Sequence, residues 1–217
     1  MLIGGLNSFS LSDFPGLVAA VVFTQGCNFR CPYCHNGSLI PMNPSTTSAL
    51  IPQEEVFLFL EKRRSQLNGV VVSGGEPTLQ PDLSEFFYRA GSMDYRIKLD
   101  TNGSHPEVLA ELLMQGLVDF IAMDIKAPFT IYDRLTGVRA PIEQLEESIA
   151  LIARSGINHE FRTTVVGPLL SESDLHAIQE MVPHGSRHRF QEFRPENALD
   201  PELRAAVEVK NNVLQVD

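Results

Sequence analysis

The sequence feature that most constrains the fold is a regular alternation of short strand-like runs with amphipathic, helix-like segments. Several of the strand-like runs are nearly continuous in apolar and β-branched residues, which is typical of strands covered on both faces. These runs cover residues 19–24, 69–73, 95–100, 119–124, 158–165 and 187–193. The helix-like segments between them cover residues 52–67, 81–90, 106–115, 141–154 and 171–181, and most begin with proline.

Strands that alternate with helices predict right-handed crossovers and a sheet of parallel strands. About six such units fit, whereas a full barrel of eight units needs about 250 residues. We therefore expect an α/β fold, a partial (β/α)6 barrel with parallel strands. The 217 residues predict one domain over 1–217, with a core at about 14–195 and a C-terminal tail at about 196–217. Reactive groups in such folds lie on the loops that follow the strands.

The net charge of the chain disfavours one class of partner, and its hydropathy disfavours a membrane segment. The formal net charge is −10, and phosphate binding needs a basic face, so we expect no nucleic-acid partner. The densest basic run, EKRR at residues 61–64, is typical of the solvated end of a helix. The longest apolar run, residues 17–23, is much shorter than the about 20 residues of a membrane span, and no secretion signal is visible. We therefore expect a cytoplasmic protein without a membrane segment.

All three cysteines of the chain lie in the stretch CNFRCPYCHN, residues 27–36. Four chemistries match it: a C-x-x-C dithiol, a c-type haem attachment sequence, a zinc site, or three thiolates for an iron–sulfur cluster. A cytoplasmic location disfavours c-type haem and a structural disulfide. The adjacent side chains of Cys34 and His35 tend to diverge, which disfavours a single zinc ion. This stretch alone leaves the alternatives open.

A second motif, SGGEP at residues 73–77, follows the strand-like run at 69–73. Two glycines let a backbone come close to a ligand and present its N–H and C=O groups. Taken alone, a pair of glycines is better explained by an ordinary turn after a strand. The position of this motif favours a functional role, because it ends the strand-like run that comes next in the chain after the three-cysteine loop.

Together these motifs resemble the radical S-adenosylmethionine (SAM) superfamily. The resemblance rests on C-x3-C-x2-C with Tyr33 before the last cysteine, followed by the GGEP strand end. It extends to SLSDFPG at residues 10–16, DTNG at 100–103 and MDIKAP at 123–128. Within the superfamily the chain is most similar, over about residues 1–195, to glycyl-radical-enzyme activases. Among these it resembles the activating protein of anaerobic ribonucleoside-triphosphate reductase.

The resemblance implies two cofactors, a [4Fe–4S] cluster and SAM. Three thiolates would hold three irons and leave the fourth iron for SAM, whose reductive cleavage gives a 5′-deoxyadenosyl radical. No cysteine is left over, so one cluster is the limit. The chemistry belongs to the cofactors, so no catalytic acid–base pair is implied. The implied cluster ligands are Cys27, Cys31 and Cys34.

The resemblance also implies a set of SAM contacts. DTNG alone is also consistent with a simple turn, and the charged pair in DIK with an exposed ion pair. The implied contacts are Tyr33, His35 and Asn36 beside the adenine, Gly74, Gly75, Glu76 and Pro77 at the methionyl amino group, and Asp100, Asn102, Asp124 and Lys126.

Two further positions follow from the resemblance. Asp100, Thr101 and Asp124 match positions that can hold a monovalent cation beside the SAM carboxylate. Asp13 matches a residue that contacts the substrate's glycyl loop, although a turn explains it equally well. Pyruvate formate-lyase activators have a histidine on the last strand, and Arg194 is the residue expected in its place here. This departure favours the reductase activator.

The resulting prediction is a radical SAM oxidoreductase that takes hydrogen from a glycine of a partner enzyme. The expected partner is anaerobic ribonucleoside-triphosphate reductase, and the expected reductant is a flavodoxin or ferredoxin. One alternative is a radical SAM enzyme that acts on a small molecule, similar to 7-carboxy-7-deazaguanine synthases. A second alternative is a C-x-x-C redox or electron-transfer protein, in which Cys27 would have no role.

Overall fold

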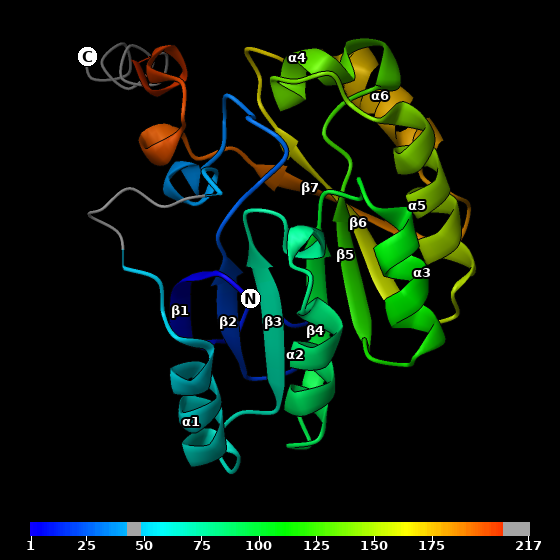
Figure 1. The fold of residues 1–217 in the computed structure, drawn as a ribbon. Helices are drawn as coiled ribbons and strands as arrows, with labels where there is room; N and C mark the ends of the chain where they lie inside the picture. The colour runs from blue at the N-terminus through cyan, green and yellow to red at the C-terminus, as the bar shows by residue number, and fades with distance from the viewer. Residues whose placement is uncertain (43–48, 206–217) are drawn as a thin grey trace, which may run out of the picture.

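The computed structural model describes residues 1–42 and 49–205, which contain one sheet of seven strands (Figure 1). Each strand pairs with the next one along the chain, and all pairs from β2 onward are parallel. The predicted α/β fold with a parallel sheet is confirmed. The strands are β1 (Ile3–Ser10), β2 (Ala19–Thr24), β3 (Gly69–Gly74), β4 (Arg96–Thr101), β5 (Phe120–Asp124), β6 (Asn158–Val165) and β7 (Arg187–Glu192).

The long helices lie where the amphipathic segments predict them. Ser171 caps the last of them, α6 (Glu172–Met181), by accepting a hydrogen bond from the Asp174 N–H, and the Asp174 carboxylate accepts one from the Ser171 N–H. None of the helices within residues 1–42 and 49–205 is long and apolar enough to cross a membrane. The helices are α1 (Gln53–Arg63), α2 (Leu83–Gly91), α3 (Pro106–Met114), α4 (Tyr132–Thr136), α5 (Ile142–Arg154) and α6 (Glu172–Met181), with short 3-10 turns η1 (Gly37–Leu39), η2 (Pro77–Leu79), η3 (Phe129–Ile131) and η4 (Pro195–Asn197).

The sheet is buried on both faces, as its β-branched strands predict. Side chains of alternate residues in a strand point to opposite faces. Val70 and Val72 accordingly belong to the large core between the sheet and its helices. Val71 belongs to a smaller cluster on the opposite face of the sheet, here called the inner face. Phe14 lies in that inner cluster and contacts Phe120 edge-on, with ring centroids 6.0 Å apart. The segment before β2 therefore covers the amino-terminal end of the inner face.

Strand β1 is the one element of the sheet that the sequence does not predict. It runs antiparallel to β2, and its register shifts between Ile3 and Gly5 and again between Asn7 and Ser10. Glycine, asparagine and serine have weak strand propensity, so the strand depends on its pairing with β2. In the described residues β1 and β7 form the two edges of the sheet, and they do not pair with each other. The barrel is therefore open along one side.

Candidate functional site

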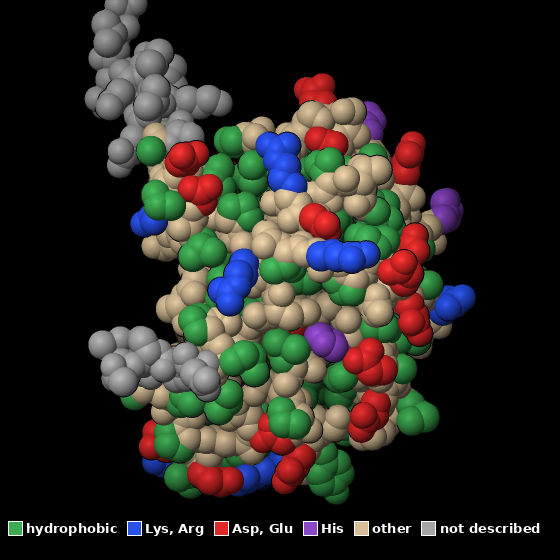
Figure 2. Space-filling model, turned by 45° about the horizontal axis from the view of Figure 1, so that its top comes forward, with side chains coloured by type: hydrophobic (Ala, Val, Ile, Leu, Met, Phe, Trp, Pro, Cys, Tyr) green, Lys and Arg blue, Asp and Glu red, His purple; other side chains and the backbone are tan. Residues whose placement is uncertain are grey.

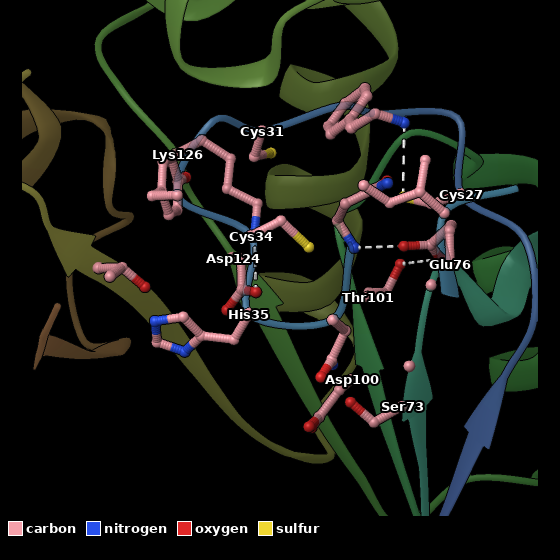
Figure 3. A pocket seen from close by; sticks show the side chains of 18 of the residues that line it. Cys27, Cys31, Cys34, His35, Ser73, Glu76, Asp100, Thr101, Asp124 and Lys126 are labelled. Atoms are coloured by element: carbon pink, nitrogen blue, oxygen red, sulfur yellow. Dashed lines mark hydrogen bonds and ion pairs between the residues drawn. The ribbon is translucent and has the colours of Figure 1, made fainter. Parts of the chain in front are cut away.

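A pocket opens at the carboxyl ends of the parallel strands, beneath the cysteine loop (Figure 3). The empty space in and above it, which includes solvent at its open mouth, is about 860 Å³. Most of the residues that the sequence predicts for the site line it. These are Cys27, Cys31, Tyr33, Cys34, His35, Asn36, Gly74, Gly75, Glu76, Asp100, Thr101, Asn102, Asp124 and Lys126.

Backbone hydrogen bonds hold the cysteine loop in place. The N–H of Cys27 donates to the carbonyl of Ile40 across 3.0 Å, and the N–H of Arg30 donates to the carbonyl of Thr136 across 2.7 Å. The N–H of Cys34 donates to the carbonyl of Cys31 across 3.0 Å, which closes a turn between two of the thiols. All three cysteines are free. The loop therefore presents three thiols to one pocket.

Burial raises the pKa of each thiol. The pKa of Cys27 rises to about 12, first because the thiol is desolvated and then because the Glu76 carboxylate lies nearby. Desolvation also raises the pKa of Cys31 to about 11 and raises that of Cys34. Redox-active C-x-x-C sites work through thiols of lowered pKa. The environment of this loop differs from such a site.

The paired glycines allow the turn after β3 to pack directly against the cysteine loop. Gly74 has a φ of 117°, which favours glycine. A Cβ atom on Gly75 would collide with the backbone carbonyl of Gly26. The N–H of Glu76 donates to that same carbonyl across 2.7 Å. Both positions thus require glycine because two backbone segments meet there.

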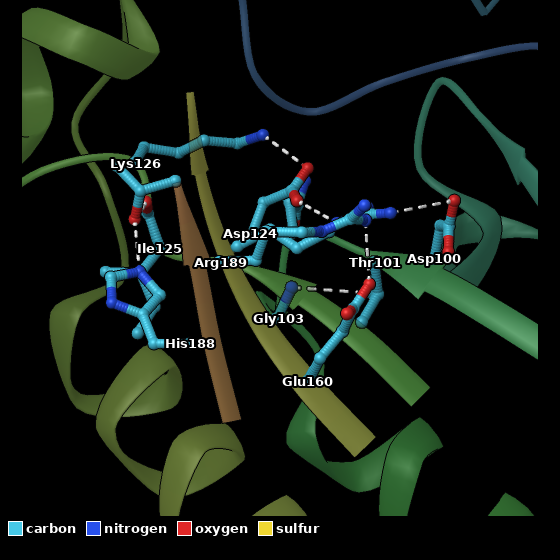
Figure 4. A network of polar contacts seen from close by, with 12 residues as sticks. Asp100, Thr101, Gly103, Asp124, Ile125, Lys126, Glu160, His188 and Arg189 are labelled. Atoms are coloured by element: carbon cyan, nitrogen blue, oxygen red, sulfur yellow. Dashed lines mark hydrogen bonds and ion pairs between the residues drawn. The ribbon is translucent and has the colours of Figure 1, made fainter. Parts of the chain in front are cut away.

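A network of charged side chains lies on the inner face of the sheet, where β4, β5 and β6 form a wall of the pocket (Figure 4). Asp124 accepts a hydrogen bond from Lys126 Nζ across 2.9 Å and one from Arg162 Nε across 2.8 Å. Arg162 Nη1 lies 3.3 Å from Asp100 Oδ2, and Asp100 also pairs with Lys98. Burial alone would raise the pKa of Asp124, but Arg162 and Lys126 hold it well below its usual value. Asp124 is therefore ionised, and both carboxylates are paired with cations of their own chain.

Some pocket residues are not predicted from the sequence. The strand β6 contributes Arg162 and Thr164, which share a face because they lie two residues apart. The alternation along that strand is the signal that identifies them. The remaining unpredicted lining residues are Phe29, Ile40 and Ser73.

Three predicted residues lie outside the pocket lining. Pro77 is buried in η2, next to residues that line the pocket. Arg194 is exposed, and Phe193 beside it stacks on the ring of His35, with centroids 5.9 Å apart and an interplanar angle of 16°. Asp13 accepts a hydrogen bond from Ser10, which pairs with the first residue of β2. Asp13 therefore lies at the opposite end of the strands from the cysteines.

The segment after β7 packs against the cysteine loop. The N–H of Asp200 donates to the carbonyl of Pro32 across 2.8 Å. Ala198 and Leu203 on either side of it are buried. Figure 1 shows this segment, in orange and red, beside the blue turn that follows the cysteines. Residues 206–217 of the predicted tail lie outside the described residues.

The pocket residues fit the two cofactors that the sequence resemblance implies. In the described residues, no three His, Cys, Asp or Glu side chains converge as one metal ion would require. A cubane cluster makes no such demand, because each thiolate binds a different iron. The buried hydroxyl of Tyr33 has no hydrogen-bond partner among the described residues, so it is available to a polar group in the pocket. Lys126 provides a cation beside it.

The described part of the face drawn in Figure 2 carries no single basic patch. Figure 2 shows Lys and Arg side chains dispersed among acidic and hydrophobic ones on the described part of this face. The net charge of the whole chain is −10. On this face, binding of an extended polyanion therefore has no continuous cationic surface to depend on.

Known proteins are similar to this chain in both sequence and fold. The family model of the radical SAM superfamily matches residues 21–182. A Methanocaldococcus jannaschii protein named "Putative glycyl-radical enzyme activating enzyme" is 34% identical over 99% of this chain and 89% of its own length. The pyruvate formate-lyase-activating enzyme of Listeria monocytogenes is 37% identical over 52% of this chain, which spans 48% of that enzyme.

Solved structures agree on the fold. Streptococcus suis SuiB bound to precursor peptide SuiA superposes with a TM-score of 0.63 at 12% identity, over 91% of this chain and 46% of that one. Identity this low shows similarity of fold alone. The sequence match over most of the chain decides the family. The chain belongs to the radical SAM superfamily, whose members use a [4Fe–4S] cluster and SAM.

Proposed function

We propose that this chain activates a glycyl-radical enzyme by taking a hydrogen atom from a glycine of that partner. The observation that carries the proposal is the 34% identity to the named activating enzyme of Methanocaldococcus jannaschii over almost the whole chain. The open side of the sheet between β1 and β7 supports it, since a loop of another protein needs such access to the pocket. When bound, the cluster and SAM supply one-electron cleavage of SAM and a radical that abstracts hydrogen.

The residues of the pocket have separate tasks in this proposal. Cys27, Cys31 and Cys34 hold the cluster. Lys126 and Asp124 bind and orient the methionyl end of SAM, together with Asp100 and Asn102. The turn from Gly74 to Pro77 binds the amino group, and Tyr33, His35 and Asn36 lie along the adenine. Asp13 contacts the partner's loop from the other end of the open side.

The expected partner remains anaerobic ribonucleoside-triphosphate reductase, and the expected reductant a flavodoxin or ferredoxin. The proposed domain is the whole chain, with the family core followed by the tail. The alternatives are a radical SAM enzyme that acts on a small molecule, and a dithiol redox protein. Cys27 lines the same pocket as Cys31 and Cys34, which weighs against the dithiol alternative, in which Cys27 would have no role.

The test is to load the protein with iron and sulfide without oxygen, reduce it with SAM present, and add candidate glycyl-radical enzymes. We expect a glycyl radical signal in electron paramagnetic resonance with the reductase, one that is absent when SAM or the cluster is omitted. SAM cleavage without a radical on any glycyl enzyme would remove the activase proposal and favour a small-molecule substrate. An intact C27A variant that still catalyses dithiol exchange would support the redox alternative.

A further inference from the structure

Side chains and one backbone N–H on the loops after β2, β3 and β4 form a closed ring of hydrogen bonds beside the pocket. The ring, here called the loop ring, consists of Asn28, Glu76, Thr78, Asn102, Ser104 and His105. Four of its members, Asn28, Thr78, Ser104 and His105, have no part in the SAM contacts proposed above. The ring therefore needs an explanation of its own.

Glu76 connects the loops after β3 and β4. Its Oε1 accepts hydrogen bonds from the hydroxyls of Thr78 across 2.6 Å and Thr101 across 2.7 Å, and from the Thr78 N–H across 3.1 Å. Its Oε2 accepts one from the N–H of Asn102 across 2.7 Å. Figure 3 shows the contact with Thr101 beneath the cysteine loop. Because the side chain is 1% exposed, all of these donors act on a fixed carboxylate.

Asn28 extends the ring to the cysteine loop. The side-chain amide of Asn102 donates to Asn28 Oδ1 across 2.9 Å, and that of Asn28 donates to Ser104 Oγ across 2.8 Å. Asn28 follows Cys27 directly in the chain. Two amide side chains thus add to the backbone hydrogen bond from Glu76 to Gly26 in joining this thiol's loop to the loops after β3 and β4.

His105 closes the ring. Its Nδ1 lies 3.1 Å from Thr78 Oγ1 and 3.0 Å from Ser104 Oγ. Thr78 gives its hydroxyl hydrogen to Glu76, so its oxygen accepts from His105 and the network assigns a proton to Nδ1. A hydrogen-bond donor at Nδ1 therefore links Thr78, on the loop after β3, to Ser104, on the loop after β4.

We propose that His105 and Asn28 are positioning residues, which fix the Cys27 end of the cysteine loop relative to the turn from Gly74 to Glu76. The cluster and the amino group of SAM would meet across this gap, so the ring sets the geometry of their contact. Neither residue needs to touch a reacting atom. The inference rests on the proposed cofactor site and not on the identity of the partner enzyme.

The test compares His105→Ala, His105→Asn and the control His184→Ala, an exposed histidine outside the ring, in the full-length, cluster-loaded protein. Two readouts are the rate at which an iron chelator bleaches the cluster, and KM and kcat for reductive SAM cleavage. We expect His105→Ala to bleach about three- to tenfold faster and to raise KM by a similar factor, with kcat within about twofold. An asparagine amide can replace Nδ1, so His105→Asn should bring both values within about twofold of the parent.

Asn28→Ala provides a second arm. If both residues act through the ring, the double variant with His105→Ala should bleach more slowly than the product of the two single effects predicts. The proposal is overturned if His105→Ala behaves like His184→Ala, or if His105→Asn is no better than His105→Ala. Should His105→Ala fail to take up iron, Ser104→Ala answers the same question, because it removes one contact of Nδ1 and leaves the imidazole. Bleaching needs neither SAM nor a partner, so this result stands apart from the outcome for the activase proposal.

Discussion

Arg162 on β6 donates from Nε to Oδ1 of Asp124 on β5 across 2.8 Å, in a side-chain pair that is mostly shielded from water. The same guanidinium lies 3.3 Å from Asp100 Oδ2. One arginine thus joins the two carboxylates to which the sequence resemblance assigns a monovalent cation. The positive charge between them comes from the chain itself.

Replacement of Arg162 should therefore create a dependence on added cations. In the parent protein we expect the KM for SAM to change less than about twofold between sodium, potassium and choline chloride at equal ionic strength. In Arg162→Ala the two carboxylates repel each other, so KM should be at least about fivefold lower in sodium or potassium than in choline. Cleavage assays in the three salts measure this. A strong cation dependence of the parent protein would contradict it.

Asp124 should stabilise the fold in a pH-dependent way. Its pKa in the folded chain lies well below the unfolded value of about 3.9, so its full contribution is present above the unfolded value, shrinks below it, and is lost only as the pH falls through the folded value. Asp124→Asn should cost about 1–3 kcal/mol at pH 7 and clearly less at pH 2.5. Urea unfolding of the metal-free protein at both values checks this. An equal loss at both would exclude the ionic contribution.

Gly75→Ala should impair assembly of the cluster. The added methyl group would press on the carbonyl of Gly26, one residue before the first cysteine. We expect iron content after reconstitution to fall by at least about half. The matched control is Gly167→Ala, where a Cβ meets nothing within 4 Å. Equal iron content in both variants would show that the turn moves without disturbing the loop.

Each cysteine should be required for the cluster to the same extent. Cys27→Ala, Cys31→Ala and Cys34→Ala should each lose the visible iron–sulfur absorbance and the cleavage of SAM, because each removes one iron ligand. A dithiol site would tolerate Cys27→Ala, so this variant separates the two chemistries. Absorbance and deoxyadenosine release after anaerobic loading are the measurements.

The sequence predicts most of the sheet because its information there is local. Runs such as VVV in β3 and the prolines before the helices specify elements without reference to distant residues. Strand β1 escapes prediction because Gly4 and Gly5 carry no strand signal, and its partner is another part of the chain. The short helix α4 is missed for a different reason, because it offers too few residues for a periodic pattern.

The site is predictable where the motifs are contiguous and not where the fold brings residues together. The cysteines, the paired glycines and the charged pair at 124 and 126 all line the pocket, as expected. Arg194 is exposed, although the resemblance places it at the SAM pocket, and Arg162 contributes the arginine of the pocket instead. Asp13 lies far along the strands because β1 runs in the reverse direction.

The hydrogen bond between Asp200 and Pro32 has a consequence for biosynthesis. The cysteines are synthesised well before Asp200, so their loop forms at first without this contact. Leu203, which is buried in the same segment, is synthesised later still. A nascent cysteine loop can therefore form its bonds to Ile40 and Thr136 before it gains the one from Asp200.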